Sequence, residues 1–347
     1  MAAPGTILDG KYVVERVLGE GGMGMVVAAV HKDLGHRVAI KMMLPHAAEH
    51  PEMLARFERE ARAAAGLSSE HAARVTDVGR FETGMPFMVM EFLEGEDLEQ
   101  AIRRQRQLPI AEAVRYFIQA CIGLHDAHTH GIVHRDVKPS NIFLARRPSG
   151  RVVVKILDFG IAKASLAQES HSLTRTSTVM GSPQYMSPEQ LADTKSVDLR
   201  TDVWSLGAAF YEAITGTQAF PAETLAQLHV KIITEAPTRP TLLRRECPPE
   251  LEMALLNCLE KGPSQRYSSM AALQRDLERI EMRLSSQAPL FDSSPELMRT
   301  ELPSSPELGA TRAPDGVAPA EGLSGTGLPT SKTFHDAPPA RKRAEFR

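Results

Sequence analysis

The segments Val133-His134-Arg135-Asp136-Val137-Lys138-Pro139-Ser140-Asn141 and Asp158-Phe159-Gly160 bring two carboxylates, an ammonium group and a carboxamide into a short part of the chain. Transfer of a phosphoryl group needs little covalent chemistry from a protein. It needs metal ions, phosphates and an acceptor hydroxyl to be held in line. Carboxylate and amide oxygens suit magnesium, and an ammonium group suits a phosphate. The two segments therefore predict a site for magnesium-assisted phosphoryl transfer.

The composition narrows the class of protein around these segments. A chain of 347 residues can form one domain of about 270 residues with a tail, or two ordinary domains. Its net charge of -3 argues against a nucleic-acid binder, because binding to a phosphate backbone normally shows as a basic excess. The three cysteines form no close pair, which favours a reducing compartment over a disulfide framework.

The apolar pattern predicts neither a signal peptide nor a membrane span. The first five residues, Met1 to Gly5, lack a basic region followed by an apolar core. The longest apolar stretch, from Val203 to Ile214, is too short and too interrupted to cross a bilayer. We therefore expect a soluble cytoplasmic protein.

The first ninety residues predict a small antiparallel sheet interrupted by one helix. Short runs rich in β-branched or apolar residues are separated by glycine or charged turns, and they occur at 12–14, 25–30, 37–41, 73–81 and 86–90. Between them, Met53, Phe57, Ala61 and Ala64 recur at three- and four-residue steps, which predicts a helix over 51–67.

Beyond Leu98 the pattern is mostly helical, and the chemistry-bearing segments fall at the junction of the two parts. Helices are predicted at 109–128, 187–191, 196–215, 222–233, 249–259 and 268–284. After residue 285 the composition shifts to Pro, Ser, Gly, Thr and Ala, which predicts disorder. The run Ser-Ser-Pro-Glu-Leu occurs twice there, at 293–297 and 304–308, either by low-complexity coincidence or as a docking or phosphorylation motif.

A glycine-rich segment lies between the first two predicted strands, at Leu18-Gly19-Glu20-Gly21-Gly22-Met23-Gly24. The same glycines are also typical of a plain hairpin turn between two strands. The segment is neither a Walker A motif nor a Rossmann fingerprint, because no Gly-Lys-Ser/Thr follows and a strand comes next. Lys41 favours a phosphate-binding loop, because it ends an apolar strand where an unpaired lysine is costly.

Lys41 needs an anionic partner, and the helix predicted over 51–67 offers two carboxylates. Glu60 lies on the same stripe as Phe57 and Ala64, although it could instead pair with Arg56 at the surface. Glu58 is the alternative, on a neighbouring stripe. We prefer Glu60, and we expect the position of this helix to decide whether the pair forms.

Four histidines, at 125, 128, 130 and 134, come close together in the sequence. A transition-metal site is an unfavoured interpretation, because a second set of ligands is missing. His125 and His128 are instead expected to end a buried helix, and His134 to pack against the catalytic loop.

Together these motifs resemble the Hanks-type serine/threonine protein kinases of bacteria, over about Lys11 to Ile280. The bacterial pattern is seen in Gly19-Glu20-Gly21-Gly22-Met23-Gly24 and in Ser187-Pro188-Glu189-Gln190. The resemblance implies ATP and magnesium, or manganese in its place, as cofactors. It implies an α+β, bilobed fold with a small antiparallel β lobe and a larger, mostly α-helical lobe.

The resemblance also implies domain boundaries and site residues. It gives an N-terminal extension at 1–10, a kinase domain at 11–281 with lobes 11–90 and 94–281 and a hinge at 91–93, and a disordered Pro/Ser-rich tail at 285–347. Asp136 would accept the substrate hydroxyl proton and Lys138 would neutralise the γ-phosphate. Asn141 and Asp158 would hold magnesium, and Lys41, paired with Glu60, would anchor the α/β-phosphates.

The nucleotide pocket follows from the same resemblance. The phosphates would lie under Leu18, Gly19, Gly21 and Gly24. Val26 and Ala39 would cover the adenine ring from above, and Phe143 would support it from below. The backbone of Glu91 to Leu93 would supply the hinge hydrogen bonds, and Met90 would be the gatekeeper. A small apolar core would include the same apolar residues.

The resemblance further implies a substrate class and a mode of activation. Lys138, two residues after Asp136, is typical of kinases that act on serine and threonine. A phosphate on the activation segment would pair with Arg135, and Thr174 and Thr176 are the expected sites. A hydroxyl-rich mobile loop is the alternative interpretation.

The remaining expected roles are structural. Glu189 would pair with Arg266, Asp202 would brace the catalytic loop, and His134 and Phe159 would support it. Ser187 departs from the family pattern, because it stands where the Ala-Pro-Glu motif has alanine.

Two other functions compete with a protein kinase. A nucleotide-binding pseudokinase or scaffold is disfavoured by intact Lys41, Asp136, Asn141 and Asp158. A small-molecule kinase of the aminoglycoside or choline type generally lacks the arginine before the catalytic aspartate and the Ser-Pro-Glu segment. The expected partners are protein substrates and, by analogy with bacterial relatives, a second copy for trans-autophosphorylation.

Overall fold

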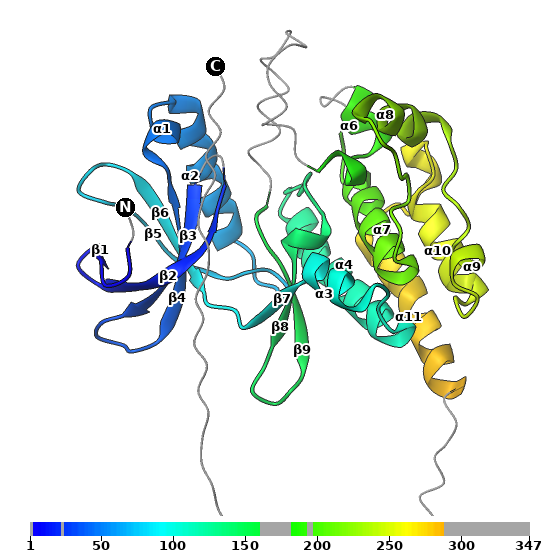
Figure 1. Cartoon of the computed structure of the whole chain (residues 1–347), viewed down its shortest axis with the longest axis horizontal. Helices are drawn as coiled ribbons and strands as arrows, with labels where there is room; N and C mark the ends of the chain where they lie inside the picture. The colour runs from blue at the N-terminus through cyan, green and yellow to red at the C-terminus, as the bar shows by residue number, and fades with distance from the viewer. Residues whose placement is uncertain (1–2, 22–23, 160–181, 193–196, 288–347) are drawn as a thin grey trace, which may run out of the picture. The chain divides into compact units, whose positions relative to one another are not determined.

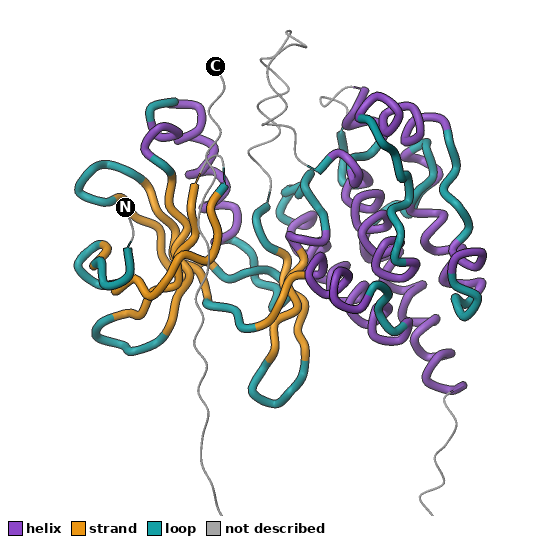
Figure 2. The backbone as a smooth tube through the Cα atoms, viewed as in Figure 1, coloured by secondary structure: helices purple, strands orange, loops and turns teal. Residues whose placement is uncertain are grey.

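The computed structural model describes residues 3–21, 24–159, 182–192 and 197–287. By its contacts the chain divides into Met1–Leu290 and Phe291–Arg347, and all described residues belong to the first unit. Strands dominate the N-terminal part of this unit and helices its C-terminal part (Figures 1 and 2). The predicted α+β arrangement, with a β-rich part followed by a larger, mostly helical part, is confirmed. No helix in the described ranges combines the length and the apolar character that crossing a membrane demands.

The N-terminal part is a six-stranded antiparallel sheet with the strand order β1-β2-β3-β4-β6-β5. The strands are β1 (Ile7–Leu8), β2 (Tyr12–Glu20), β3 (Gly24–His31), β4 (Arg37–Met43), β5 (Val75–Arg80) and β6 (Pro86–Glu91). Period-two alternation divides the residues of the central strands between two faces. Val27, Ile40 and Val89 belong to the core of one face.

Two helices lie between β4 and β5, where the sequence predicts one. They are α1 (Pro45–Ala48) and α2 (Pro51–Ala65). Pro51 starts α2 at a position where a missing N–H costs nothing, because the first N–H groups of a helix have no partner within it. Phe57 and Ala61 of α2 are buried against Met43 and Met88 on the second face of the sheet. α2 is thereby attached to the strands that carry the nucleotide-site candidates.

The C-terminal part consists of helices and one small sheet, ordered β7-β8-β9. Its strands are β7 (Gly95–Asp97), β8 (Ile142–Arg146) and β9 (Val152–Ile156). Its α-helices are α3 (Leu98–Gln105), α4 (Ile110–Thr129), α6 (Pro188–Ala192), α7 (Arg200–Thr215), α8 (Leu225–Thr234), α9 (Pro240–Leu243), α10 (Pro249–Cys258) and α11 (Met270–Gln287). Within the described ranges, 3₁₀ turns occur at η1 (Pro139–Asn141), η2 (Pro183–Tyr185) and η4 (Pro263–Gln265).

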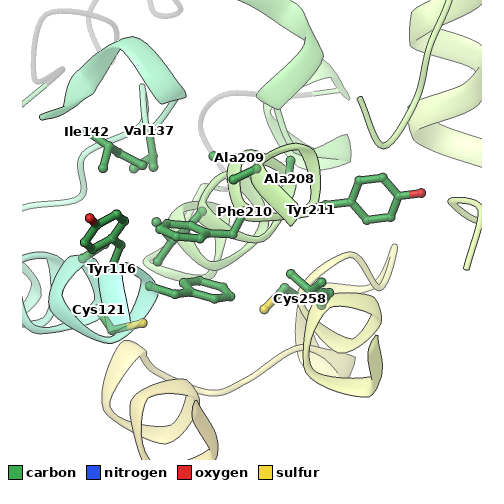
Figure 3. Packing of buried hydrophobic residues seen from close by; sticks show 14 of the residues in the cluster. Tyr116, Cys121, Val137, Ile142, Ala208, Ala209, Phe210, Tyr211 and Cys258 are labelled. Carbon is green, nitrogen blue, oxygen red and sulfur yellow. The ribbon is translucent and has the colours of Figure 1, made fainter. Parts of the chain in front are cut away.

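The core of this part is built around α4 and α7. The rings of Phe117 and Phe210 stack with centroids 4.2 Å apart, and Figure 3 shows Phe210, which lies on α7, among other buried residues of this core. A Cβ added at Gly207 would lie 2.4 Å from the Cβ of Cys258, so glycine is required for the close approach of α7 and α10. Trp204 is fully buried as well. A helix buried on all sides makes α7 a rigid support for the segments that contact it.

The predicted strands and helices are confirmed in type, and most helix ends agree within a few residues. The helix predicted from residue 196 begins at Arg200. Residues 193–196 lie outside the described part of the chain, as does most of the tail predicted over 285–347. Ile7 and Leu8, expected within an N-terminal extension, pair with β2. The β8–β9 hairpin was missed, because no helix or strand was assigned between residues 128 and 187, and each strand of the hairpin is only five residues long.

Candidate active site

The loop that carries Asp136 is fixed by Asp202 at the start of α7. The Asp202 side chain is fully buried, and its two oxygens accept hydrogen bonds from the backbone N–H groups of His134 and Arg135, both at 2.8 Å. The Nε2 atom of His128, near the end of α4, lies 2.8 Å from the same carboxylate. A buried carboxylate with three partners sets the position of the loop against two core helices.

His134 links this loop to the segment that carries Asp158. Its Nδ1 atom accepts the N–H of Asp136 at 3.2 Å, so the ring proton is on Nε2, which donates to the Leu157 carbonyl at 2.9 Å. Its ring lies 5.0 Å from the ring of Phe159. His134 is fully buried and Phe159 nearly so. The two segments quoted at the start of the sequence are therefore in direct contact.

The β8–β9 hairpin brings Asn141 and Asp158 to one end of the small sheet. Ile142 pairs with Ile156, so the residues just before β8 lie beside those just after β9. The N–H of Leu157 donates to the carbonyl of Asn141 at 2.9 Å. The hairpin, which sequence reasoning missed, is thus the element that gathers the two expected magnesium ligands.

Asp136, Lys138 and Asn141 form a cluster within the loop. The Asn141 amide nitrogen donates to the backbone carbonyl of Asp136 at 2.9 Å and lies 3.4 Å from its Oδ2 atom. The ammonium of Lys138 is 3.3 Å from the same oxygen. Because the nitrogen end of the Asn141 amide faces Asp136, its oxygen end is left for a cation.

Lys41 on β4 connects the two parts of the unit. Its Nζ atom lies 2.7 Å from Oε1 of Glu60 on α2 and 2.7 Å from Oδ1 of Asp158. Burial disfavours the charged ammonium, but the two carboxylates outweigh it and raise the pKa of Lys41 above its usual value. Lys41 in turn lowers the pKa of Asp158. The site therefore keeps one ammonium and one ionised carboxylate side by side.

Glu58, the alternative to Glu60, makes other contacts. Its carboxylate pairs with Arg62 one turn further along α2 and with Arg80 at the end of β5. The two glutamates point in different directions because they lie two positions apart on a helix. The structure therefore places Glu60, the preferred residue, beside Lys41.

The residues expected around adenine share one face of the large sheet. Val26 pairs with Lys41, and Ala39 pairs with Met90, so all four side chains lie on the same side. Phe143, expected on the opposite side of the ring, lies on β8 and pairs with Lys155. Lys41 shows that this face is the one turned toward Asp158.

The glycine-rich segment lies between β2 and β3, which pair as antiparallel strands, and its residues 22 and 23 lie outside the described part of the chain. Gly24 is required by the protein itself, because an added Cβ would come within 2.5 Å of the Met42 carbonyl oxygen. At Gly19 an added Cβ meets nothing within 4 Å, and at Gly21 the nearest atom is 4.0 Å away. Packing among the described residues does not explain these two glycines, but a phosphate chain beneath the loop would. Leu18 is 40% exposed at the same end of β2.

Glu91, expected in the hinge, has a partner that sequence reasoning missed. Its side chain lies 2.5 Å from Nζ of Lys155 on β9, whose own side chain is buried. The Glu91 carboxylate also accepts the N–H of Arg74, and the Glu91 N–H donates to the Arg74 carbonyl. For the expected adenine contacts this leaves the carbonyl of Glu91 and the backbone of Leu93. The sequence did contain a signal for this pair, because Lys155 lies within an otherwise apolar run and a buried lysine needs an anionic partner.

The structure brings Glu189 and Arg266 together as a bidentate pair, with N–O distances of 2.7 and 2.8 Å. The Arg266 side chain is fully buried. Burial acts to raise the pKa of Glu189, but the hydrogen bonds and charge of Arg266 outweigh it, so that this pKa lies below its usual value. The pair attaches α6 to the large helical part.

The donor set fits magnesium better than a transition metal. No group of three or more His, Cys, Asp or Glu side chains suited to a metal occurs in the described ranges. His128 and His134 are instead committed to Asp202 and Leu157. One carboxylate from Asp158 and one amide oxygen from Asn141 match the few oxygen ligands that magnesium takes when phosphates supply others. Thr174 and Thr176, the expected phosphorylation sites, lie outside the described residues.

The described geometry has counterparts in known proteins. A family described as the protein kinase domain matches residues 12–277. The chain is 36% identical over 285 residues to serine/threonine-protein kinase PknB of Mycolicibacterium smegmatis, covering 81% of this chain and 45% of that protein. It is 36% identical over 298 residues to serine/threonine-protein kinase pkn3 of Myxococcus xanthus, covering 84% and 54%. The chain thus spans about half the length of these curated relatives.

A solved structure of a protein kinase domain is also similar to this chain. The crystal structure of the Mycobacterium tuberculosis PknI kinase domain superposes with a TM-score of 0.60 at 26% identity, over 80% of this chain and 98% of that one.

Proposed function

The chain belongs to the protein kinase family, and from this premise we propose that it transfers the γ-phosphoryl group of ATP to serine and threonine hydroxyls of proteins. One observation carries the proposal. Lys41 contacts Glu60 and Asp158 at the same time, at 2.7 Å each. The N-terminal part and the C-terminal part of the unit therefore meet at these three charged groups. In phosphoryl transfer, a paired lysine and a metal-binding aspartate must both be in place.

Each residue of the cluster has a role in this proposal. Asn141 and Asp158 would hold magnesium, which supplies positive charge to the phosphates when bound. Lys41 would bind the α/β-phosphates, with Glu60 fixing its direction. Asp136 would accept the proton of the substrate hydroxyl. Lys138, 3.3 Å from Asp136, would place its charge where the transferred group passes.

Incubation of the purified chain with γ-labelled ATP and magnesium tests the reaction. We expect label on the chain itself or on an added protein substrate, and we expect phosphoserine and phosphothreonine after acid hydrolysis. A chelator should abolish the label. Nucleotide binding without any transfer would contradict the proposal in favour of a pseudokinase. Label on an aminoglycoside or choline but on no protein would contradict it in favour of a small-molecule kinase.

Lys41→Met is expected to lower kcat by about 10²-fold, because one preorganised charge is removed from the phosphates. The substitution also leaves Asp158 without the cation that lowers its pKa. The pKa of Asp158 should rise, so the acidic limb of the kcat/KM profile should move to higher pH. Steady-state assays across pH measure both effects. Lys32→Met, at an exposed lysine, is the matched control. If the wild type, Lys41→Met and Lys32→Met had the same kcat and the same pH profile of kcat/KM, the role given to Lys41 would be contradicted.

Activation by phosphorylation forms part of the proposal. Arg135 precedes Asp136, and a phosphate on Thr174 or Thr176 would give its guanidinium a charged partner. Trans-autophosphorylation within a homodimer is a further proposal, by analogy with the family. A cytoplasmic location is another, supported by the three cysteines, which form no close pair in the sequence.

A further inference from the structure

Gln190 on α6 is bonded at both ends of its side-chain amide. The nitrogen donates to the backbone carbonyl of Arg135 at 2.9 Å, and the oxygen accepts the N–H of Ser187 at 3.1 Å. Arg135 and Gln190 are far apart in the sequence. The amide therefore forms a bridge between the segment that ends at α6 and the loop that carries Asp136.

The carbonyl that Gln190 contacts belongs to the peptide unit that carries Asp136. A peptide unit is planar, so a bond to the Arg135 oxygen constrains the Asp136 nitrogen on its other side. That N–H donates to Nδ1 of His134 at 3.2 Å. Arg135 has a φ of 61°, in the left-handed region that a residue with a side chain seldom adopts. A peptide unit in this conformation must be held by its surroundings, and Gln190 supplies one of the contacts that hold it.

α6 is itself fixed from the other side. The hydroxyl of Ser187 lies 2.6 Å from that of Thr201 on α7, and both residues are fully buried. Glu189 is held by the bidentate pair with Arg266. Gln190 thus stands between a segment anchored to the core and the peptide that carries Asp136. This also gives a role to the hydroxyl of Ser187, which the alanine of the Ala-Pro-Glu motif lacks.

We propose that Gln190 is a positioning residue for Asp136, acting through the Arg135–Asp136 peptide unit. The inference rests on the proposed function, because it assigns a role in phosphoryl transfer. Only a side chain with a donor and an acceptor at this distance can make both bonds. Glutamate keeps the length and the acceptor but loses the donor, and it sets a carboxylate against the Arg135 carbonyl. Methionine keeps nearly the same length and removes both groups without adding charge.

The two variants Gln190→Glu and Gln190→Met test the assignment. A misplaced catalytic group lowers the rate of the chemical step, so we expect kcat to fall by about 10- to 100-fold in both. The KM for ATP and the Kd for ADP should change by less than about twofold, because the nucleotide contacts are made by other residues. The melting temperature should stay close to that of the wild type. Gln100→Glu, at an exposed glutamine of α3, is the matched control and should retain wild-type kinetics.

The possible outcomes separate this inference from the proposed function. If the wild-type chain is active and both Gln190 variants keep the wild-type kcat, the positioning role alone is overturned. A parallel loss of kcat, nucleotide affinity and melting temperature would also overturn it, because it would show a structural role. Wild-type chain and Gln100→Glu without transfer would overturn the proposed function and the inference with it.

Discussion

Asp136→Asn is expected to lower kcat by about 10²–10⁴-fold, the range that a positioned general base contributes. Asparagine has the same shape but cannot accept the substrate proton. The backbone bonds that hold the loop, from His134 and Arg135 to Asp202, do not involve the replaced side chain. Nucleotide affinity should therefore change little. Steady-state phosphorylation of a peptide and calorimetric titration with ADP measure the two quantities.

The matched control for this prediction is Asp33→Asn, at an exposed aspartate in the turn between β3 and β4. It makes the same chemical change away from the cluster and should leave kcat unchanged. If Asp136→Asn and Asp33→Asn were equally active, Asp136 would have no part in proton transfer. A wild-type rate already as low as that of Asp136→Asn would identify a pseudokinase.

Arg266→Met is expected to lower the free energy of unfolding by about 3–5 kcal/mol, the usual cost of removing one member of a buried charge pair. Beyond its bidentate contact with Glu189, Arg266 donates to three backbone carbonyls, those of Arg200, Glu260 and Lys261. Methionine fills similar space but leaves these acceptors and the carboxylate without their donor. Urea unfolding at pH 7 with an unchanged m-value measures the loss.

The pH dependence of this loss has a definite sign. The pKa of Glu189 lies below its usual 4.5 in the folded protein, so the stabilisation is fully present above pH 4.5 and is lost as the pH falls through the folded value. In Arg266→Met the buried Glu189 has no cation, and its pKa should rise instead. The difference between the two proteins should therefore be largest near pH 7 and shrink as the pH falls toward 4.5.

Arg283→Met is the matched control for the stability prediction. Arg283 pairs with Glu250, but the two side chains are 65% and 46% exposed. Water screens such a pair, so its removal should cost at most about 1 kcal/mol. Equal losses in the two arginine variants would contradict a special role for the buried pair. The double variant Glu189→Leu/Arg266→Met should recover part of the loss, because no unpaired buried carboxylate remains.

Much of the fold could be predicted from local pattern. The strands around Lys41 are recognisable as short apolar runs bounded by glycine or charged turns, although both of their faces are buried. The helix that carries Glu60 shows its period clearly, because one of its faces is buried and the other is not. The β8–β9 hairpin was harder, because its two strands are short and β9 is almost continuously apolar. Such a run has no period that separates a buried strand from a buried helix.

The site shows the same division. The identities of Asp136, Asn141 and Asp158 follow from spacing and residue type, because the chemistry of phosphate and magnesium restricts which side chains can serve. Partner choice among more distant residues does not follow in this way. Lys155 meets Glu91, and Gln190 meets Arg135, only because separate segments are packed side by side.

The sequence by itself determined the family, the order of the elements and the chemical groups at the site, since these depend on residue type and on periods of a few residues. Only the tertiary structure decided which groups touch. It placed Glu60 and not Glu58 at Lys41, and it set Gln190 against the peptide of Asp136. The physical reason is that hydrogen bonds and ion pairs form over about 3 Å. Contacts at that distance between remote residues are fixed by the packing of whole helices and strands. A local sequence pattern does not predict that packing.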